Sequence, residues 1–95
     1  MAVKVIISRR VPSVLSANLR PLLLKLRALA GAQPGYISGE TLVNIDDHED
    51  IMVLSTWNSI DQWKAWKSDP RRIEIENTID SMLGDSARYG TYFYG

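Results

Sequence analysis

The residues best suited to bind or act on a small molecule are concentrated around three tryptophans. Trp57, Trp63 and Trp66 stand within ten residues of one another. Trp63 and Trp66 are three residues apart, so in a helix they lie on adjacent parts of one face. Two interpretations stay open. Both side chains pack in the core against a sheet, or at least one forms the wall of an apolar pocket and offers its indole N–H as a hydrogen-bond donor.

Two charged residues follow on the next helical segment. With about 100° of rotation per residue and Ile75 at the origin, Arg72 falls within the apolar stripe and Glu76 on its flank. One interpretation is a surface ion pair with i, i+4 spacing, which contributes only a few tenths of a kcal/mol. The other is that the pair rims a cleft in which Arg72 holds a phenolate or carboxylate oxygen.

Other chemistries have little to work with in this sequence. The chain has no cysteine, and its one histidine, His48, stands among acidic residues in a short connection. No Gly-x-Ser-x-Gly turn and no glycine-rich phosphate loop is present. We therefore expect no metal site and no cofactor. Eleven basic residues balance eleven acidic ones, which argues against nucleic acid or an anionic membrane as the main partner.

The charges are unevenly distributed along the chain. Every charged residue before Glu40 is basic, and the acidic residues concentrate in positions 46–50. Both groups are solvated surface, or they are complementary faces that meet across a dimer.

Hydrophobic periodicity predicts the elements that position these side chains. Residues 2–10 alternate as a strand, with Val3, Val5 and Ile7 on one face. The leucines that follow have helical spacing up to Gly31, and because of Pro21 we expect the regular helix to begin near Asn18, with Leu15 in a looser turn. The remaining expected elements are a hairpin of strands 36–45 and 51–57, a helix capped by Ser59, a helix that begins at Asp69-Pro70 and ends at Gly84, and a strand at 88–94. We expect Gly39 to mark a bulge or a close approach.

This order of elements predicts one α+β domain over residues 1–95, with a ferredoxin-like βαββαβ antiparallel sheet and helices on one face. The other face would carry apolar side chains such as Ile6 and either Met52 or Leu54, depending on the phase of the strand. A second copy packed sheet to sheet would cover them, so we expect a homodimer. The longest apolar runs are far shorter than the roughly 18 residues of a membrane span. The N-terminus opens directly into a strand, which predicts a cytoplasmic location.

Three runs of sequence carry a resemblance to a known family. They are Gln33-Pro-Gly-Tyr-Ile-Ser-Gly-Glu-Thr-Leu42, Leu54-Ser-Thr-Trp-Asn-Ser59 and Trp63-x-x-Trp66-x-Ser68-Asp-Pro-Arg71. Over about residues 3–94 the chain resembles the antibiotic biosynthesis monooxygenase family. The resemblance implies a dimeric α/β barrel. Its members include cofactor-independent monooxygenases that oxidise phenols or quinols with O₂, and haem-degrading enzymes.

The resemblance disfavours the haem-degrading branch. That branch uses an asparagine in the first strand, a tryptophan, and a histidine ten residues beyond it as the haem ligand. The corresponding residues here are Ser8, Trp66 and Glu76, and without an imidazole the iron lacks its usual axial ligand.

The quinol-oxidising branch needs no metal, and it implies a role for each candidate residue. Trp66 would be a wall and N–H donor, Arg72 the anion stabiliser and Glu76 a base. Tyr36 or Tyr89 would hydrogen-bond ring oxygens, with Ser8 and Trp63 completing the substrate-binding set. We expect Trp66, beside the helix break, to face the cleft more than Trp63 does. A non-catalytic small-molecule-binding dimer on the same scaffold is the alternative.

Overall fold

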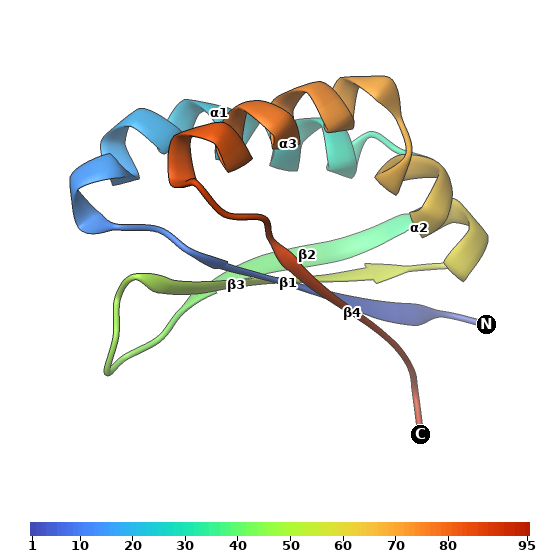
Figure 1. Ribbon diagram of the computed structural model, residues 1–95. Coiled ribbons are helices and arrows are strands. Elements are labelled where there is room, and N and C mark those ends of the chain that lie inside the picture. Colours follow the sequence, from blue (N-terminus) through green and yellow to red (C-terminus); the bar gives the residue numbers. More distant parts are fainter.

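The computed structural model describes residues 1–95, and its elements follow the predicted order (Figure 1). The strands are β1 (Val3–Arg10), β2 (Tyr36–Val43), β3 (Asp50–Trp57) and β4 (Arg88–Phe93). The helices are a short 3₁₀ turn η1 (Ser13–Leu15), α1 (Ser16–Gly31), α2 (Ile60–Lys67) and α3 (Pro70–Leu83). None of the helices is long and apolar enough to cross a membrane.

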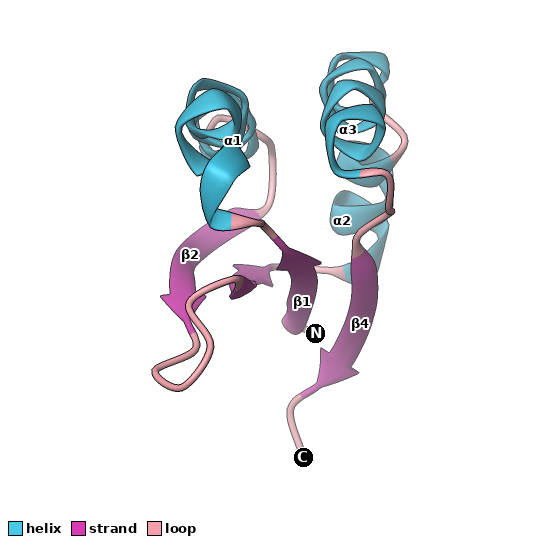
Figure 2. Cartoon of the chain, turned by 60° about the vertical axis from the view of Figure 1, so that its left-hand side comes forward, coloured by secondary structure: helices cyan, strands magenta, loops and turns pink.

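One antiparallel sheet carries all of the strands, in the order β2-β3-β1-β4. In the two central pairings Val3 lies opposite Trp57 and Phe93, and Ile6 lies opposite Leu54 and Gly90. The helices cover one face of this sheet, with α1 toward β2 and α3 toward β4 (Figure 2). This arrangement confirms the ferredoxin-like α+β prediction.

Side-chain caps mark the helix boundaries where the sequence predicts them. The Ser59 hydroxyl accepts a hydrogen bond from the backbone N–H of Gln62 at 3.3 Å. The Asp69 carboxylate accepts one from the N–H of Arg71 at 2.9 Å, with Pro70 as the first helical residue. Gly84 ends α3 with φ of 67°, a left-handed conformation that glycine adopts without strain.

The predicted boundaries of two elements were wrong by two residues. Helix α1 begins at Ser16 rather than near Asn18, because η1 leads directly into it and Pro21 lies inside the helix. The proline removes one hydrogen bond near the N-terminal end, while packing of the helix on the core retains the helical conformation. Strand β2 ends at Val43 rather than Ile45. The side-chain oxygen of Asn44 accepts hydrogen bonds from the backbone N–H groups of Asp46 and Asp47, and this turns the chain away from the strand.

The irregularity of β2 lies one step before the predicted glycine. The register with β3 shifts between Tyr36 and Ser38, so the bulge is not at Gly39. Gly39 is instead a close-approach point. A Cβ at this position would lie 2.2 Å from the Tyr36 hydroxyl oxygen, so a side chain here would displace the Tyr36 ring.

The core consists of two apolar clusters between the helices and the sheet. One combines Val3 and Val5 with the three tryptophans. The other joins Val11 to Leu19 of α1 and to Ile75 and Ile79 of α3. The inner face of the sheet is therefore packed at both ends, and the space between the clusters is available for a site.

We predict that Leu19→Ala lowers the free energy of unfolding by about 2–5 kcal/mol, because Leu19 is fully buried and alanine leaves a cavity. The matched control is Leu24→Ala in the same helix. Leu24 is 55% exposed, so the control should change stability by no more than about 0.5 kcal/mol. Urea unfolding followed by circular dichroism measures both, and equal losses would contradict the assignment of Leu19 to the core.

Candidate functional site

A cavity of about 570 Å³ lies between the helix layer and the inner face of the sheet. Side chains from β1, β2, β3, α1, α2 and α3 line it, and most of them are apolar. A volume of several hundred Å³ with a few polar groups is typical of a site for a small organic molecule. The cavity is thus large enough for a substrate of more than one ring.

Strand alternation directs specific residues into this cavity. Ile7 and Arg9 of β1, and Val53, Ser55 and Trp57 of β3, stand at every second position and all line it. Helix α1 completes the opposite wall with residues at helical spacing. Each strand and helix therefore lines the cavity with the side chains of one of its faces, which is what the spacing of these residues in the sequence predicts.

Aromatic rings form one wall of the site. Tyr36 contacts Trp57 edge to face at 5.4 Å between ring centroids, and Trp57 lies 5.7 Å from Trp63. The Trp57 N–H donates to the Ser55 hydroxyl at 3.1 Å. Trp57 was not among the predicted site residues, although its place at the inner-facing end of β3 marks it.

Trp63 and Trp66 both line the cavity and are almost equally buried, at 3% and 4% exposed. Neither indole N–H makes a hydrogen bond within the chain. Trp63 also lies 6.2 Å from the ring of Tyr89 and has the Arg72 guanidinium over its own ring at 5.4 Å. The geometry therefore does not distinguish Trp66 from Trp63 as the residue that faces the cleft more. The first turns of α2 lie over the cavity too, so Trp63 is exposed to it.

A buried ion cluster forms the polar end of the site. Glu76 accepts hydrogen bonds on both carboxylate oxygens from Arg9, and a further one at 3.3 Å from Arg72. All three side chains are buried and all three line the cavity. Buried charges need such partners because desolvation is costly.

This geometry changes two predicted roles. Glu76 is neither half of a surface pair nor a free base, because two guanidinium groups occupy its oxygens. Arg72 donates from one nitrogen to Glu76 and, at 2.7 Å, to the Tyr89 hydroxyl; another of its nitrogens donates to the Lys67 carbonyl at 3.4 Å. The sequence alone did not indicate Arg9. The signal was available in the alternation, which puts residue 9 on the same face as Val3, Val5 and Ile7.

Two of the predicted substrate-binding residues lie elsewhere. Ser8 falls between Ile7 and Arg9, so strand alternation turns it to the outer face of the sheet, where it pairs with Met52 and Arg88. Its assignment to the site was wrong. Tyr89 does not line the cavity and takes part only through its contacts with Arg72 and Trp63.

One more acid lies beside the ion cluster. Burial raises the pKa of Asp80, and the nearby Glu76 carboxylate raises this pKa further. The Asp80 Oδ1 atom and the Arg9 Nε atom are both buried without a hydrogen-bond partner. No group of three or more His, Cys, Asp or Glu side chains is arranged to hold a metal ion.

We predict that Asp80→Asn stabilises the protein near neutral pH and not in acid. A carboxyl whose pKa is higher in the folded state adds stability below its unfolded value of about 3.9, and this stability is lost as the pH rises through the folded value. The neutral amide avoids that loss. Urea unfolding of variant and wild type at about pH 3.5 and 7 measures the difference.

The control for this prediction is Glu74→Gln, an exposed acid on the same helix. It should change the unfolding free energy by the same amount at both pH values. A less stable Asp80→Asn variant at neutral pH would show that the Asp80 carboxylate makes an ion contact that folding needs.

Solved structures of other proteins share this fold at low sequence identity. A conserved protein from Methanosarcina mazei Go1 is 15% identical with a TM-score of 0.90, over 100% of this chain and 94% of that chain. SnoaB, a cofactor-independent oxygenase from Streptomyces nogalater, is 16% identical with a TM-score of 0.84, over 99% and 93%. Rv0793 from Mycobacterium tuberculosis is 15% identical with a TM-score of 0.86, over 100% and 96%. These similarities show the fold.

Sequence comparison shows the family. No curated protein sequence matches the chain. The sequence model of the family described as antibiotic biosynthesis monooxygenase matches residues 2–74, well over half of the chain. The matched range contains every residue that lines the cavity except Glu76. The chain therefore belongs to the antibiotic biosynthesis monooxygenase family.

Proposed function

We propose that this protein is a cofactor-independent monooxygenase that oxidises an aromatic small molecule of the phenol or quinol type with O₂. The observation that carries the proposal is the cavity of about 570 Å³, whose wall combines tryptophan rings with a buried arginine cluster beside them. Flat rings pack well against tryptophan, and guanidinium groups stabilise the anion of a phenol. Family membership supports the same reaction class.

The chemistry requires an electron-rich anion and O₂ in a dry site. The phenol loses its proton, and the phenolate transfers one electron to O₂, which gives a phenoxyl radical and superoxide. These combine at a ring carbon that bears one hydrogen, and the peroxide anion takes up the proton that the phenol lost. The resulting hydroperoxide loses water through cleavage of its O–O bond and of the C–H bond, which leaves a carbonyl. One oxygen atom of O₂ ends in the product and the other in water. The protein contributes orientation, exclusion of water and stabilisation of the anion.

The named residues divide this work between the aromatic wall and the ion cluster beside it. Trp57, Trp63 and Tyr36 hold the ring system, and Trp66 offers an indole N–H that no group of the chain uses. Arg9 and Arg72 together carry one more positive charge than Glu76 neutralises, so their surplus favours an anionic ring oxygen. We assign Glu76 to holding both guanidiniums in place.

The alternatives have less support from the geometry. A non-catalytic binding dimer is favoured when Trp63 and Trp66 fill the cleft, whereas here the cleft beside them is open and contains Arg72. For haem degradation, Glu76 stands at the position of the histidine ligand, and its oxygens are occupied by arginines.

We also propose that the protein is a homodimer through the outer face of the sheet. This face carries Ile6 opposite Leu54, and Leu42 opposite Met52, of which the last two are 45% and 36% exposed. Exposed apolar side chains on one sheet face are typical of an interface. A partner sheet would cover them, which completes the barrel that the family resemblance implies.

Sedimentation equilibrium at micromolar concentration should give twice the 10.7 kDa chain mass. The double variant Leu42→Lys/Met52→Lys puts like charges directly opposite each other on this face and should shift the mass to that of one chain. Val14→Lys, an 84% exposed site off the sheet, is the control and should remain dimeric. A wild-type monomer would rule out the proposed assembly.

The oxygenase proposal is tested with an oxygen electrode. Purified protein without added metal or flavin should consume O₂ with at least one member of a panel of hydroquinones and anthrones. Trp66→Phe removes the free N–H, and we expect it to raise KM or lower kcat. Trp63→Phe breaks contacts with Trp57, Tyr89 and Arg72, so it should lower the melting temperature as well.

Two results would contradict these roles. Unchanged kinetics in Trp66→Phe would remove Trp66 from the site. Absence of O₂ uptake across the panel, with measurable binding of the same compounds, would favour the non-catalytic binding protein.

A further inference from the structure

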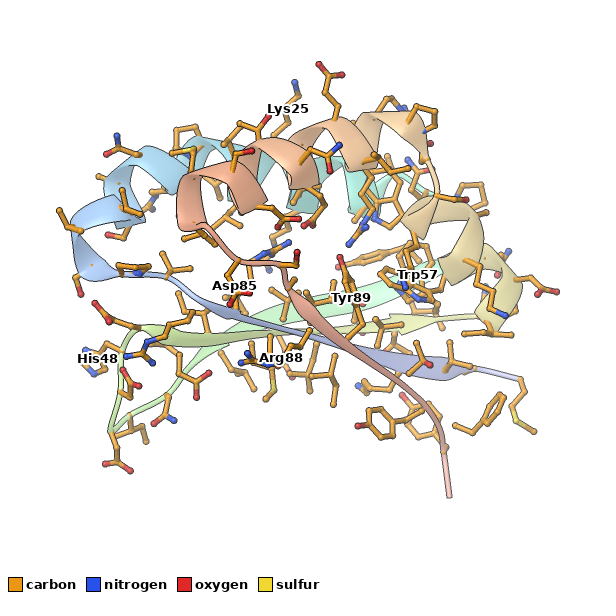
Figure 3. All side chains as sticks on the ribbon, in the orientation of Figure 1. Lys25, His48, Trp57, Asp85, Arg88 and Tyr89 are labelled. Carbon is orange, nitrogen blue, oxygen red and sulfur yellow. The ribbon has the colours of Figure 1, made fainter.

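Two residues of the edge strand β2 line the cavity although their spacing does not fit a regular strand. Tyr36 and Gly39 both line it, whereas residues three apart in an unbroken strand point to opposite faces. Tyr36 pairs with Trp57 and Gly39 pairs with Ser55, because the bulge between them holds one extra residue. Trp57 points from β3 toward the helix layer (Figure 3). The bulge therefore turns Tyr36 and Gly39 to the same, inner face of the sheet.

The Tyr36 ring occupies the space that a side chain at residue 39 would take. A Cβ built on Gly39 lies 2.2 Å from the Tyr36 hydroxyl oxygen and 3.2 Å from the ring carbon Cζ that carries the hydroxyl. The same ring meets Trp57 edge to face at 5.4 Å. Gly39 does not have a positive φ, so its backbone accepts alanine, and the methyl group would be too close only to Tyr36.

A methyl group at residue 39 would move the ring in one direction. The hydroxyl oxygen has to retreat from 2.2 Å to the 3.4 Å of ordinary van der Waals contact, a displacement of at least 1.2 Å. The backbone of β2 lies beneath the ring, and Trp57 lies beside it. The ring therefore lifts away from the strand, and the space above it is the cavity that Tyr36 and Gly39 line.

We propose that residue 39 determines the size of the aromatic ring system that the cavity accepts. Gly39 keeps the Tyr36 ring flat on β2, and a side chain at this position pushes that ring into the space of the ligand. Gly39 is a positioning residue that acts through Tyr36. The inference rests on the proposed function for the location of the ligand and adds the feature that limits the size of that ligand.

A purely structural role makes a different prediction. An aromatic ring over a glycine also stabilises a strand by covering its backbone. If the Tyr36 ring did only this, Gly39→Ala would lower the melting temperature and would leave the choice of ligand unchanged. The decisive readout is therefore a ratio of two affinities, which a uniform loss of stability does not alter.

Binding under nitrogen tests the proposal without turnover. The probes are 2-naphthol and 9-phenanthrol, phenols of two and three fused rings, and isothermal titration calorimetry gives both affinities. Wild type should bind the larger phenol more tightly, because more apolar surface is buried. Gly39→Ala should reduce this preference at least about fivefold, the lower end of the cost of overpacking a filled site.

A second substitution should reverse this loss. Tyr36→Phe removes the hydroxyl oxygen, and the closest remaining ring atom is then Cζ, at 3.2 Å from the new methyl group. A shift of a few tenths of an ångström relieves that contact. The double variant Tyr36→Phe/Gly39→Ala should therefore match the preference of Tyr36→Phe alone within about twofold, a non-additive result that requires contact between the two residues.

The matched control repeats the clash away from the cavity. A Cβ on Gly90 of β4 would lie 2.8 Å from a ring carbon of Tyr92, and neither residue lines the cavity. Gly90→Ala should lower the melting temperature and leave the preference for the larger phenol unchanged.

An unchanged preference in Gly39→Ala would overturn the inference. A loss that Tyr36→Phe does not reverse, a loss that Gly90→Ala reproduces, or a double variant that does not fold would do the same. The two proposals fail separately. A preference controlled by residue 39 without O₂ uptake leaves the size limit and removes the oxygenase. O₂ uptake with a preference that Gly39→Ala does not change does the reverse.

Discussion

The hydrogen bonds of Glu76 with Arg9 and Arg72 join the two layers of the molecule. Arg9 belongs to a central strand and the other two residues to α3, so the cluster ties the helix layer to the sheet. A buried carboxylate without these donors would carry a desolvation cost of several kcal/mol, and either arginine without the carboxylate would do the same. The three side chains are therefore interdependent, and the polar end of the cavity exists only when α3 sits above β1.

The same cluster supplies polar groups to the space above the sheet. Arg9, Arg72 and Glu76 all line the cavity, and most of its other lining residues are apolar. The tryptophans of one cluster and the leucines and isoleucines of the other supply the burial that stabilises a small domain. The cavity between them therefore has an apolar wall and a cationic end, which is the environment that an aromatic anion needs.

Patterns among residues close together in sequence were sufficient to predict the helices and strands of this protein. Alternation in β1 and β3, the Ser59 and Asp69 caps and the glycine at the end of α3 all depend on residues close together in sequence. The errors occurred where a local rule met a competing interaction. Packing on the core overrides the penalty of Pro21, and the Asn44 side chain ends β2 earlier than the run of apolar residues suggests. The proximity of Trp63, Trp66 and Arg72 could also be predicted, because all lie on two consecutive helices.

The sequence by itself determined the βαββαβ order, the helix ends and the aromatic and basic character of the site. Only the tertiary structure decided that Arg9 binds Glu76, sixty-seven residues away. The reason is that periodicity reports which residues of one element share a face, but not which partner a charged group meets across the core. That choice depends on how β1 and α3 are placed by all of the packing between them, and it changed Glu76 from a free base to the anchor of two arginines.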